Sequence, residues 1–267
     1  MRGLRLDGRV AIVSGGLRGI GGAISRALAE DGAHVVITDL DDPGSADAAA
    51  ALQSLDKASY LHLDATSEDD WRAARDSIEQ EFGRLDILVN NVGADLTGKV
   101  QDLDLIAWRR LMAINIDSVF LGTKTFQPLL AATGATTPYG SSIINISSIM
   151  GIVGMGEVSA YNASKGAVRL FTKSNALEFA DGGVPIRVNS VHPGFVETPL
   201  LHQGMERWAQ RDGGTAAEKI EAMAQTTPVK RLAQPIEIGR VVAFLASDDA
   251  SYMTGSEVIV DGGWTAR

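Results

Sequence analysis

The chain has 267 residues, of which 45% are hydrophobic and 21% are charged. This length and composition are typical of a globular α/β protein that can bury a core without disulfides. Cysteine is absent and the formal net charge is −9. These values exclude thiol catalysis and disfavour nucleic acid as a partner, because an acidic chain repels phosphate backbones.

We expect no targeting or membrane signal in this chain. Residues 1–8 lack the apolar core of a signal peptide, and the apolar runs are much shorter than the roughly 20 residues of a membrane helix. We therefore expect a cytoplasmic protein without membrane contact. No repeat or linker is present, so residues 1–267 are expected to form a single domain.

Short β-branched runs alternate with longer amphipathic stretches. This alternation predicts a doubly wound, Rossmann-type parallel sheet with helices on both faces. Residues 199–235 are longer than a simple connection and have a helical pattern, so we expect them to form a substrate lid. The expected strands are residues 9–14, 34–39, 59–63, 86–90, 142–147, 186–191 and 257–260, and the expected helices are residues 19–31, 45–54, 67–82, 103–131 and 159–180.

A glycine-rich turn, SGGLRGIG at residues 14–21, follows the first predicted strand. Glycines allow a sharp turn and a close approach of phosphate, and the next helix offers free N–H groups to a pyrophosphate. A turn without a ligand is the alternative, but the strand before it and the helix after it favour a dinucleotide site. The expected contacts are Gly15, Leu17, Arg18, Gly19, Ile20 and Gly21.

The second predicted strand ends at Asp39, where a carboxylate can accept hydrogen bonds from the adenosine ribose. The alternative is a solvated acid, like the neighbouring Asp41 and Asp42. These carboxylates would repel the 2′-phosphate of NADP, since two unit charges ~4 Å apart interact by about 4 kcal/mol at an effective dielectric of about 20. Arg18 argues for NADP instead, because a basic residue in the glycine turn could contact that phosphate, although it could equally point to solvent. We expect the cofactor to be NAD.

Tyr161 and Lys165 are four positions apart at the start of a predicted helix and so share one face. A YxxxK match alone is common by chance. A cation close to a partly desolvated tyrosine can lower its pKa by ~3 units, which makes the phenol a usable acid or base. Ser148 ends the fifth predicted strand, at the sheet edge where ligands bind, and competes for this position with Ser147. A serine that holds a substrate oxygen and a tyrosine that moves its proton would catalyse oxidation or reduction.

Together these motifs resemble the short-chain dehydrogenase/reductase family along nearly the whole chain. Further matches are Asp64 after the third strand, NNVG at residues 90–93, Asn115 within INIDSVF, and HPGFVET at residues 192–198. The resemblance implies a hydride transfer between NAD and a secondary alcohol or ketone. Ser14, Ala65 and Val92 depart from the commonest family pattern, in small changes away from the proton path.

The resemblance also implies individual roles. Asn115 would bind a water that continues the proton path from Tyr161 through Lys165, although an asparagine in an apolar helix can instead bond a loop. Lys165 would also bond the nicotinamide ribose, and His192 is expected to be structural. Other residues that border the cofactor would be Asp64, Ala65, Asn90, Asn91, Gly93, Tyr161, Pro193, Gly194, Val196 and Thr198.

The expected substrate contacts are apolar, which suits a hydrophobic cyclic or aryl alcohol or ketone. Some of them could serve only to pack the lid. No basic residue is placed to anchor a carboxylate, with Arg207 left open. The expected contacts are Leu96, Ile149, Val153, Met155, Leu200, Leu201, Met205 and Trp208.

Within the family, SKGAVRLFTK and the ending DGGWTAR most resemble bacterial cyclic secondary-alcohol dehydrogenases of the cyclopentanol type, and hydroxysteroid dehydrogenases are nearly as similar. The family also implies a homotetramer built on the helices from Leu103 and Ser159. A carrier-protein ketoreductase using NADPH is a further alternative, which Asp39 and the acidic charge disfavour. A non-catalytic NAD sensor has no reason to keep Ser148, Tyr161 and Lys165 together with Asn115.

Overall fold

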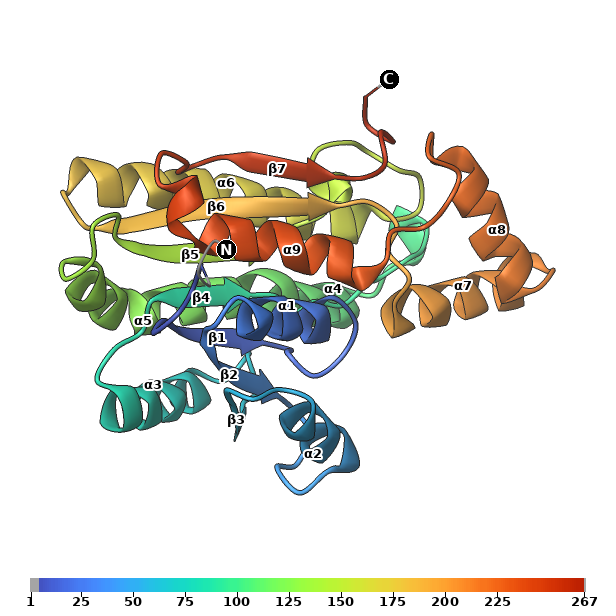
Figure 1. The fold of residues 1–267 in the computed structure, drawn as a ribbon. Helices are drawn as coiled ribbons and strands as arrows, with labels where there is room; N and C mark the ends of the chain where they lie inside the picture. The colour runs from blue at the N-terminus through green and yellow to red at the C-terminus, as the bar shows by residue number, and fades with distance from the viewer. Residues whose placement is uncertain (1–4, 267) are drawn as a thin grey trace.

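The computed structural model describes residues 5–266. Residues 1–4, part of the segment predicted to lack a signal peptide, lie outside the described residues. Seven strands form a sheet in the order β3-β2-β1-β4-β5-β6-β7, and every neighbouring pair is parallel (Figure 1). The doubly wound, Rossmann-type prediction is therefore confirmed. The strands are β1 Val10–Ser14, β2 His34–Asp39, β3 Ala58–His62, β4 Ile87–Asn90, β5 Ser141–Ile146, β6 Ile186–Pro193 and β7 Glu257–Val260.

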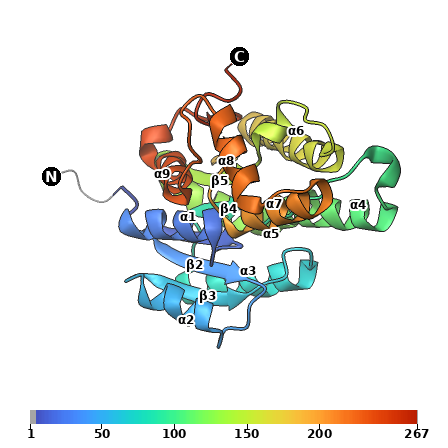
Figure 2. The ribbon, with the colours of Figure 1, turned by 90° about the vertical axis from the view of Figure 1, so that its right-hand side faces the viewer.

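Helices cover both faces of the sheet (Figure 2). Helices α1 and α9 pack against each other in one layer, and α3, α5 and α6 belong to the other. Within residues 5–266, no helix is both long and apolar enough to cross a membrane. The helices of the two layers and their connections are α1 Gly19–Glu30, α2 Ala46–Gln53, α3 Glu68–Phe82, α4 Leu105–Met112, α5 Ser118–Gly134, α6 Ser159–Asp181 and α9 Pro235–Ala246.

The central strands are buried on both faces, because successive side chains point into opposite helical layers. In β1, Ala11 and Val13 join the core beneath α1 and α9, whereas Ile12 joins the core beneath α3 and α5. Trp71 of α3 and Phe126 of α5 fill the second core and meet edge to face, with ring centroids 6.0 Å apart. Burial on both sides explains why these strands read as continuous apolar runs.

Two elements differ from the prediction. The long helix expected over residues 103–131 is interrupted by a π-helical turn, Ala113–Asp117, between α4 and α5. A π turn adds one residue without breaking the apolar stripe, so periodicity does not reveal it. Helix α9 was missing from the prediction, although Pro235 in its first turn and the capping box from Gln234 to Glu237 are start signals.

Two further helices, α7 Pro199–Asp212 and α8 Ala216–Thr226, stand apart from both layers, beyond the carboxyl ends of the strands (Figure 1). The hydroxyl of Thr198 caps α7 by accepting from the Leu201 N–H, and Thr215 with Glu218 forms a capping box on α8. Residues 199–226 are therefore helical apart from the short link at 213–215, as their sequence pattern predicted, whereas residues 227–234 are not helical. We call α7 and α8 the lid helices.

A buried polar chain joins β4, β5 and α6 beneath the carboxyl edge. Asn90 Nδ2 donates to Asn145 Oδ1 at 2.8 Å, and Asn145 Nδ2 donates to Thr172 Oγ1 at 2.9 Å. Asn145 and Thr172 are fully buried. Water cannot replace a lost partner at such a position, so each bond is worth more than an exposed one.

We predict that Asn145→Ala lowers the free energy of unfolding by about 1–3 kcal/mol, because it removes the nearer of the two acceptors of the buried Asn90 amide. Urea denaturation followed by circular dichroism would measure the change. Asn175→Ala is the matched control: Asn175 bonds the carbonyl of Phe171 in its own helix and is only partly buried. Equal losses of unfolding free energy in the two variants would mean that the buried hydrogen bonds of Asn145 contribute no more to stability than the partly buried one of Asn175.

Candidate active site

A cavity of about 610 Å³ opens at the carboxyl edge of the sheet. Its walls contain residues that directly follow β1, β4, β5 and β6, on both sides of the point where the strand order reverses between β1 and β4. Doubly wound sheets bind ligands at this switch point. The cavity brings the glycine turn and Asp39 into one space with Ser148, Tyr161 and Lys165.

The glycine turn has the features of a phosphate cradle. A Cβ atom on Gly21 would lie 1.9 Å from the carbonyl oxygen of Gly15, which itself has φ +62°, so neither position accepts a side chain without strain. No side chain caps the N-terminus of α1, and its first turn holds no acidic residue. Its N–H groups and dipole therefore remain available to an anion, which fits the pyrophosphate of a dinucleotide.

Two predicted contacts in this turn behave differently from the others. The side chain of Leu17 packs on the hydrophobic core and does not line the cavity. Its backbone N–H donates to the Asp39 carboxylate at 3.4 Å. Arg18 lines the cavity, but its guanidinium pairs with Asp41 and Asp47, each at 3.0 Å. The basic residue that argued for NADP is thus already neutralised by two carboxylates.

Asp39 stands at the end of β2 on the wall of the cavity, where its second oxygen accepts from the Leu40 N–H at 2.9 Å. Both contacts of the carboxylate are to backbone N–H groups of its own surroundings. No basic side chain among the described residues forms an ion pair with Asp39. A negative charge therefore faces the position that the sequence assigned to the adenosine ribose.

The other predicted cofactor residues line the same cavity, except Asn90, which is buried below it and donates to Asn145 Oδ1. Asn91 serves mainly to fasten it: Nδ2 donates to the carbonyls of Ser14 and Gly15 at 3.0 and 3.1 Å. A Cβ atom on Gly93 would come within 3.2 Å of Lys165 Nζ, so glycine clears the space for that ammonium. The lining residues predicted for the cofactor are Gly15, Arg18, Gly19, Ile20, Gly21, Asp39, Asp64, Ala65, Asn91, Gly93, Tyr161, Lys165, Pro193, Gly194, Val196 and Thr198.

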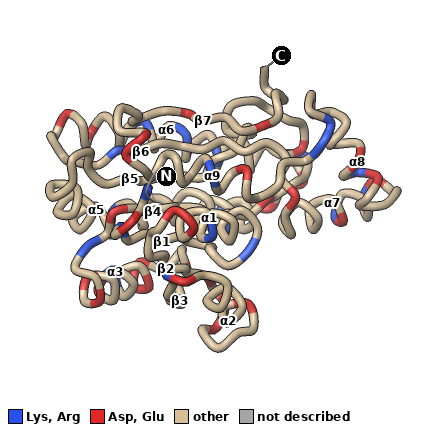
Figure 3. Tube along the Cα trace, viewed as in Figure 1, with Lys and Arg blue, Asp and Glu red and all other residues tan. Residues whose placement is uncertain are grey.

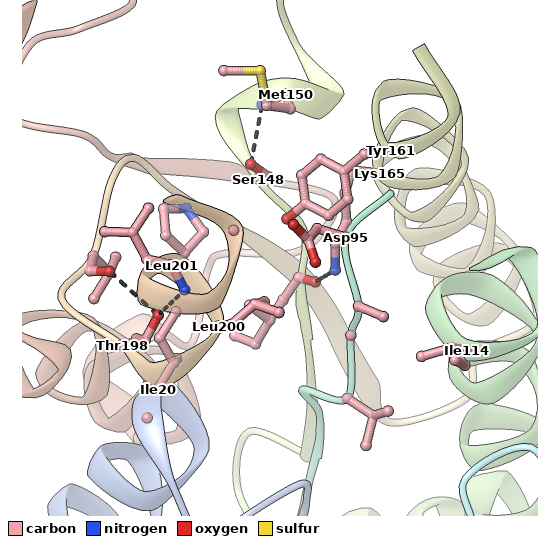
Figure 4. Close-up of a pocket in the computed structure, with 18 of the residues that line it drawn as sticks. Ile20, Asp95, Ile114, Ser148, Met150, Tyr161, Lys165, Thr198, Leu200 and Leu201 are labelled. Carbon is pink, nitrogen blue, oxygen red and sulfur yellow. Dashed lines mark hydrogen bonds between the residues drawn. The ribbon is translucent and has the colours of Figure 1, made fainter. Parts of the chain in front are cut away.

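Ser148, Tyr161 and Lys165 meet in one corner of the cavity (Figure 4). Ser148 follows β5 and accepts from the Met150 N–H at 3.1 Å. Lys165 Nζ lies 5.9 Å from the centre of the Tyr161 ring and donates to the Ile146 carbonyl at 3.0 Å. Ser147 also lines the cavity, but its hydroxyl donates to the Lys165 carbonyl, which favours Ser148 of the two serines.

Burial dominates the ionisation of this corner. It raises the pKa of Tyr161 to about 12; the Ser148 hydroxyl opposes the rise and the charge of Asp95 adds to it. Burial also lowers the pKa of Lys165 to about 8. The lowered tyrosine pKa expected from Lys165 is not found within the protein alone, because the effect of burial is the largest. The phenol of Tyr161 therefore keeps its proton at neutral pH.

Asn115 lies behind the cavity wall and does not line the cavity itself. The π turn directs its fully buried side chain at the segment after β4, where Oδ1 accepts from the Ala94 N–H at 2.8 Å. Its Nδ2 donates to the Ala94 carbonyl and to Ser164 Oγ, both at 2.9 Å. The side chain thus bonds a loop, the alternative that the sequence left open, and the water relay stays a prediction.

His192 is buried directly beneath the catalytic corner. Its Nδ1 lies 3.0 Å from the Ser148 carbonyl and its Nε2 lies 2.8 Å from Ser190 Oγ. Burial lowers its pKa, although the bond to Ser148 opposes the change. A neutral imidazole that donates to the Ser148 carbonyl has the structural role expected from the sequence.

At the lid end the walls are mainly apolar. Two predicted substrate residues, Leu96 and Val153, do not line the cavity. In the extended segment after β4, Asp95 and Thr97 face the cavity, so Leu96 between them faces away. The carbonyl of Val153 accepts a hydrogen bond from Asn162 Nδ2. The predicted substrate residues that do line the cavity are Ile149, Met155, Leu200, Leu201, Met205 and Trp208. Sequence reasoning missed Met150, Val158 and Met223, and the charged Asp95, Glu157 and Arg211.

The fold and this corner define an oxidoreductase of the kind that uses a nicotinamide cofactor, and comparison with known proteins agrees. A family model described as enoyl-(acyl carrier protein) reductase, from the short-chain dehydrogenases, matches residues 15–265. The chain belongs to the short-chain dehydrogenase/reductase family and is an enzyme of its alcohol dehydrogenase type. A solved structure of ligand-free aldohexose dehydrogenase from Thermoplasma acidophilum is 33% identical with a TM-score of 0.87, covering 100% of this chain and 97% of that one.

Several characterised relatives match over nearly the full length. The NADP-dependent (R)-specific alcohol dehydrogenase of Lentilactobacillus kefiri is 40% identical, and the cyclopentanol dehydrogenase of Comamonas sp. (strain NCIMB 9872) is 42% identical; each match covers 98% of this chain and 99% of the relative. The 3-alpha-(or 20-beta)-hydroxysteroid dehydrogenase of Mycobacterium tuberculosis (strain CDC 1551 / Oshkosh) is 43% identical, over 98% of this chain and 91% of the relative. The predicted resemblance is confirmed.

We predict that Gly21→Ala lowers the affinity for NADH by about tenfold or more, because the added methyl collides with the Gly15 carbonyl and deforms the phosphate cradle. Titration of NADH fluorescence would measure it. Gly154→Ala is the matched control, since no atom lies within 4 Å of the methyl it adds. A folded Gly21→Ala variant with unchanged affinity would exclude this turn as the cofactor cradle.

Proposed function

We propose that this enzyme transfers a hydride between NAD(H) and an apolar, cyclic or aryl, secondary alcohol or ketone, with Tyr161 as the acid or base. One observation carries the proposal. A single cavity holds a glycine cradle with an acidic ribose position at one end, and Ser148, Tyr161 and Lys165 beneath an apolar lid at the other. Cofactor and substrate would thus meet at the group that moves the proton.

The chain's own residues account for the proton chemistry. Ser148 would donate a hydrogen bond to the substrate oxygen, which holds it beside Tyr161. During reduction the phenol gives its proton to this oxygen, and during oxidation the phenolate takes it from the alcohol. Lys165 supplies a positive charge beside the ring. When bound, NAD would supply the hydride acceptor or donor. Because the pKa of Tyr161 stands at about 12, oxidation should quicken as the pH rises.

NAD is the favoured cofactor on electrostatic grounds. Asp39 has no basic partner among the described residues, and Arg18 is held by Asp41 and Asp47. A 2′-phosphate would have to displace one of these carboxylates from Arg18 and tolerate Asp39. The Lentilactobacillus kefiri relative is named NADP-dependent, so the family itself does not decide the cofactor.

The lid end favours a hydrophobic substrate, because Ile149, Leu200, Leu201, Met205 and Trp208 line it and the charged Glu157 and Arg211 there pair with each other. Cyclopentanol dehydrogenase is the relative that best fits a cyclic alcohol. A hydroxysteroid is the second candidate, supported by the Mycobacterium tuberculosis relative and by the size of the cavity.

We further propose that the enzyme acts in the cytoplasm as a homotetramer. Large apolar side chains stand exposed on the outer faces of α4, α5 and α6, the helices predicted to form an interface. Covering such side chains is a common reason for assembly. They are Leu105, Ile106, Phe120, Leu170 and Leu177.

The proposal predicts turnover with NAD on cyclic, aryl or steroid secondary alcohols, and a loss of about 10²-fold or more in Tyr161→Phe, since general acid–base catalysis contributes that much. Absorbance of the reduced nicotinamide would follow turnover. NADH affinity should stay within a few-fold. Tyr139→Phe is the control, because Tyr139 is exposed and remote from the cavity. Retained activity in Tyr161→Phe would overturn its role in proton transfer.

We predict that Asp39→Ala narrows the preference for NAD over NADP by about tenfold or more, because it removes the charge that repels the 2′-phosphate. The ratio of kcat/KM with the two cofactors measures this. Asp42→Ala is the matched control, since Asp42 accepts from the Gly44 N–H and does not line the cavity. An unchanged ratio in Asp39→Ala would show that Asp39 does not touch the ribose.

A further inference from the structure

Lid helix α7 carries two arginines one turn apart, and each pairs with a carboxylate of the sheet domain. Arg207 Nη2 contacts both oxygens of Asp95, at 2.6 and 2.7 Å. Arg211 contacts Glu157 at 2.6 Å and also its neighbour Asp212. Figure 3 shows acidic and basic positions side by side along the lid helices. Arg207, left open as a carboxylate anchor for the substrate, therefore binds a carboxylate of the protein.

Asp95 belongs to the wall that surrounds Tyr161. It follows β4 after the NNVG motif, lines the same cavity, and its side chain is only 23% exposed (Figure 4). Helix α7 passes directly over it, because a Cβ atom on Gly204 would lie 3.2 Å from Asp95 Oδ2. The carboxylate is thus enclosed between the lid and the catalytic corner.

Few charged groups face Tyr161 from the surrounding elements. Lys165 lies one turn away on α6, and Asp95 approaches from the segment after β4. Ser148 is neutral, and His192 behind it is held neutral by burial. Glu157 and Arg211 line the lid end of the cavity as a pair, and Arg207 reaches this region only through Asp95. Asp95 is therefore the negatively charged group that acts on Tyr161 from the cavity wall.

We propose that Asp95 and Arg207 are positioning residues that couple the placement of lid helix α7 to proton transfer at Tyr161. With α7 seated, Arg207 offsets part of the negative charge of the carboxylate beside the tyrosine. With α7 displaced, Asp95 carries a full negative charge that disfavours the phenolate. The proton step is then efficient only when the substrate is enclosed. This inference rests on the proposed function of the site.

The sign of each substitution follows from charge alone. Arg207→Gln leaves the charge of Asp95 uncompensated, which raises the pKa of Tyr161. The rising limb, the pH range over which kcat/KM for alcohol oxidation increases with pH, therefore moves to higher pH. Asp95→Asn leaves Arg207 uncompensated, so the limb moves to lower pH. The double variant restores neutrality and should return the limb close to that of the wild type. Arg207→Lys keeps the charge and should do the same.

The experiment measures kcat/KM against pH for a secondary alcohol that the wild-type enzyme oxidises. We expect opposite shifts of about 0.5 to 1 pH unit in the two single variants, equal to three- to tenfold in rate at a fixed pH on the limb. Arg211→Gln is the matched control, because it removes the other contact between α7 and the sheet domain without changing the charge at Asp95. Its limb should not move.

A second readout does not depend on turnover. Ultraviolet absorbance reports the phenolate, and the difference between each variant and the same variant carrying Tyr161→Phe isolates Tyr161 from the other tyrosines. The titration should shift in the same directions as the rate. Shifts of one sign in both single variants, or an equal shift in Arg211→Gln, would mean that lid packing matters and the charge does not, and would overturn the proposal.

The two proposals fail in different ways. If no secondary alcohol is oxidised by the wild-type enzyme, the proposed function falls, while the phenolate titration still tests the coupling. If the wild type turns over and all limbs and titrations coincide, the coupling falls and the proposed function stands.

Discussion

The cavity at the carboxyl edge of the sheet depends on one seam, the junction between β1 and β4 where the strand order reverses. Asn91 closes it with three bonds: its backbone N–H meets Ser14 Oγ, and its amide donates to the carbonyls of Ser14 and Gly15. These bonds hold the glycine turn against the strand that leads to Gly93 and Asp95. The phosphate cradle and the wall segment that contains Gly93 and Asp95 are both positioned from this seam.

Most arginines near the cavity form ion pairs within the protein. Arg18 pairs with Asp41 and Asp47, Arg207 pairs with Asp95, and Arg211 pairs with Glu157 and Asp212. Asp39 at the ribose position and the buried Lys165 form no ion pair within the described part of the chain. The unpaired charges thus lie where a polar cofactor and a reacting oxygen would be bound, and the lid end remains close to neutral.

Local patterns were sufficient to predict the sheet, the glycine turn and the catalytic corner. The hydrophobic residues of strands and helices recur with different periods, and glycines mark the turn. Tyr161 and Lys165 are four residues apart, so they share a helix face in any surroundings. Helix α9, which was also missing, has local start signals, whereas the other missing parts depend on long-range contacts. The π turn at Asn115 is held by Ala94, the inward side of residues 95–97 is set by an extended segment, and the partner of Arg207 comes from the other side of the cavity. No local pattern specifies such pairs.

The walls of the cavity draw on segments from Gly15 near the start of the chain to Met223 in α8. During synthesis the glycine turn emerges first, but the surfaces that enclose it arrive only with β6 and the lid helices. A nascent chain can therefore form the first strands and helices without forming the cavity. Cofactor capture would belong to the last stage of biogenesis, and by mass action it would then stabilise the assembled chain as a unit.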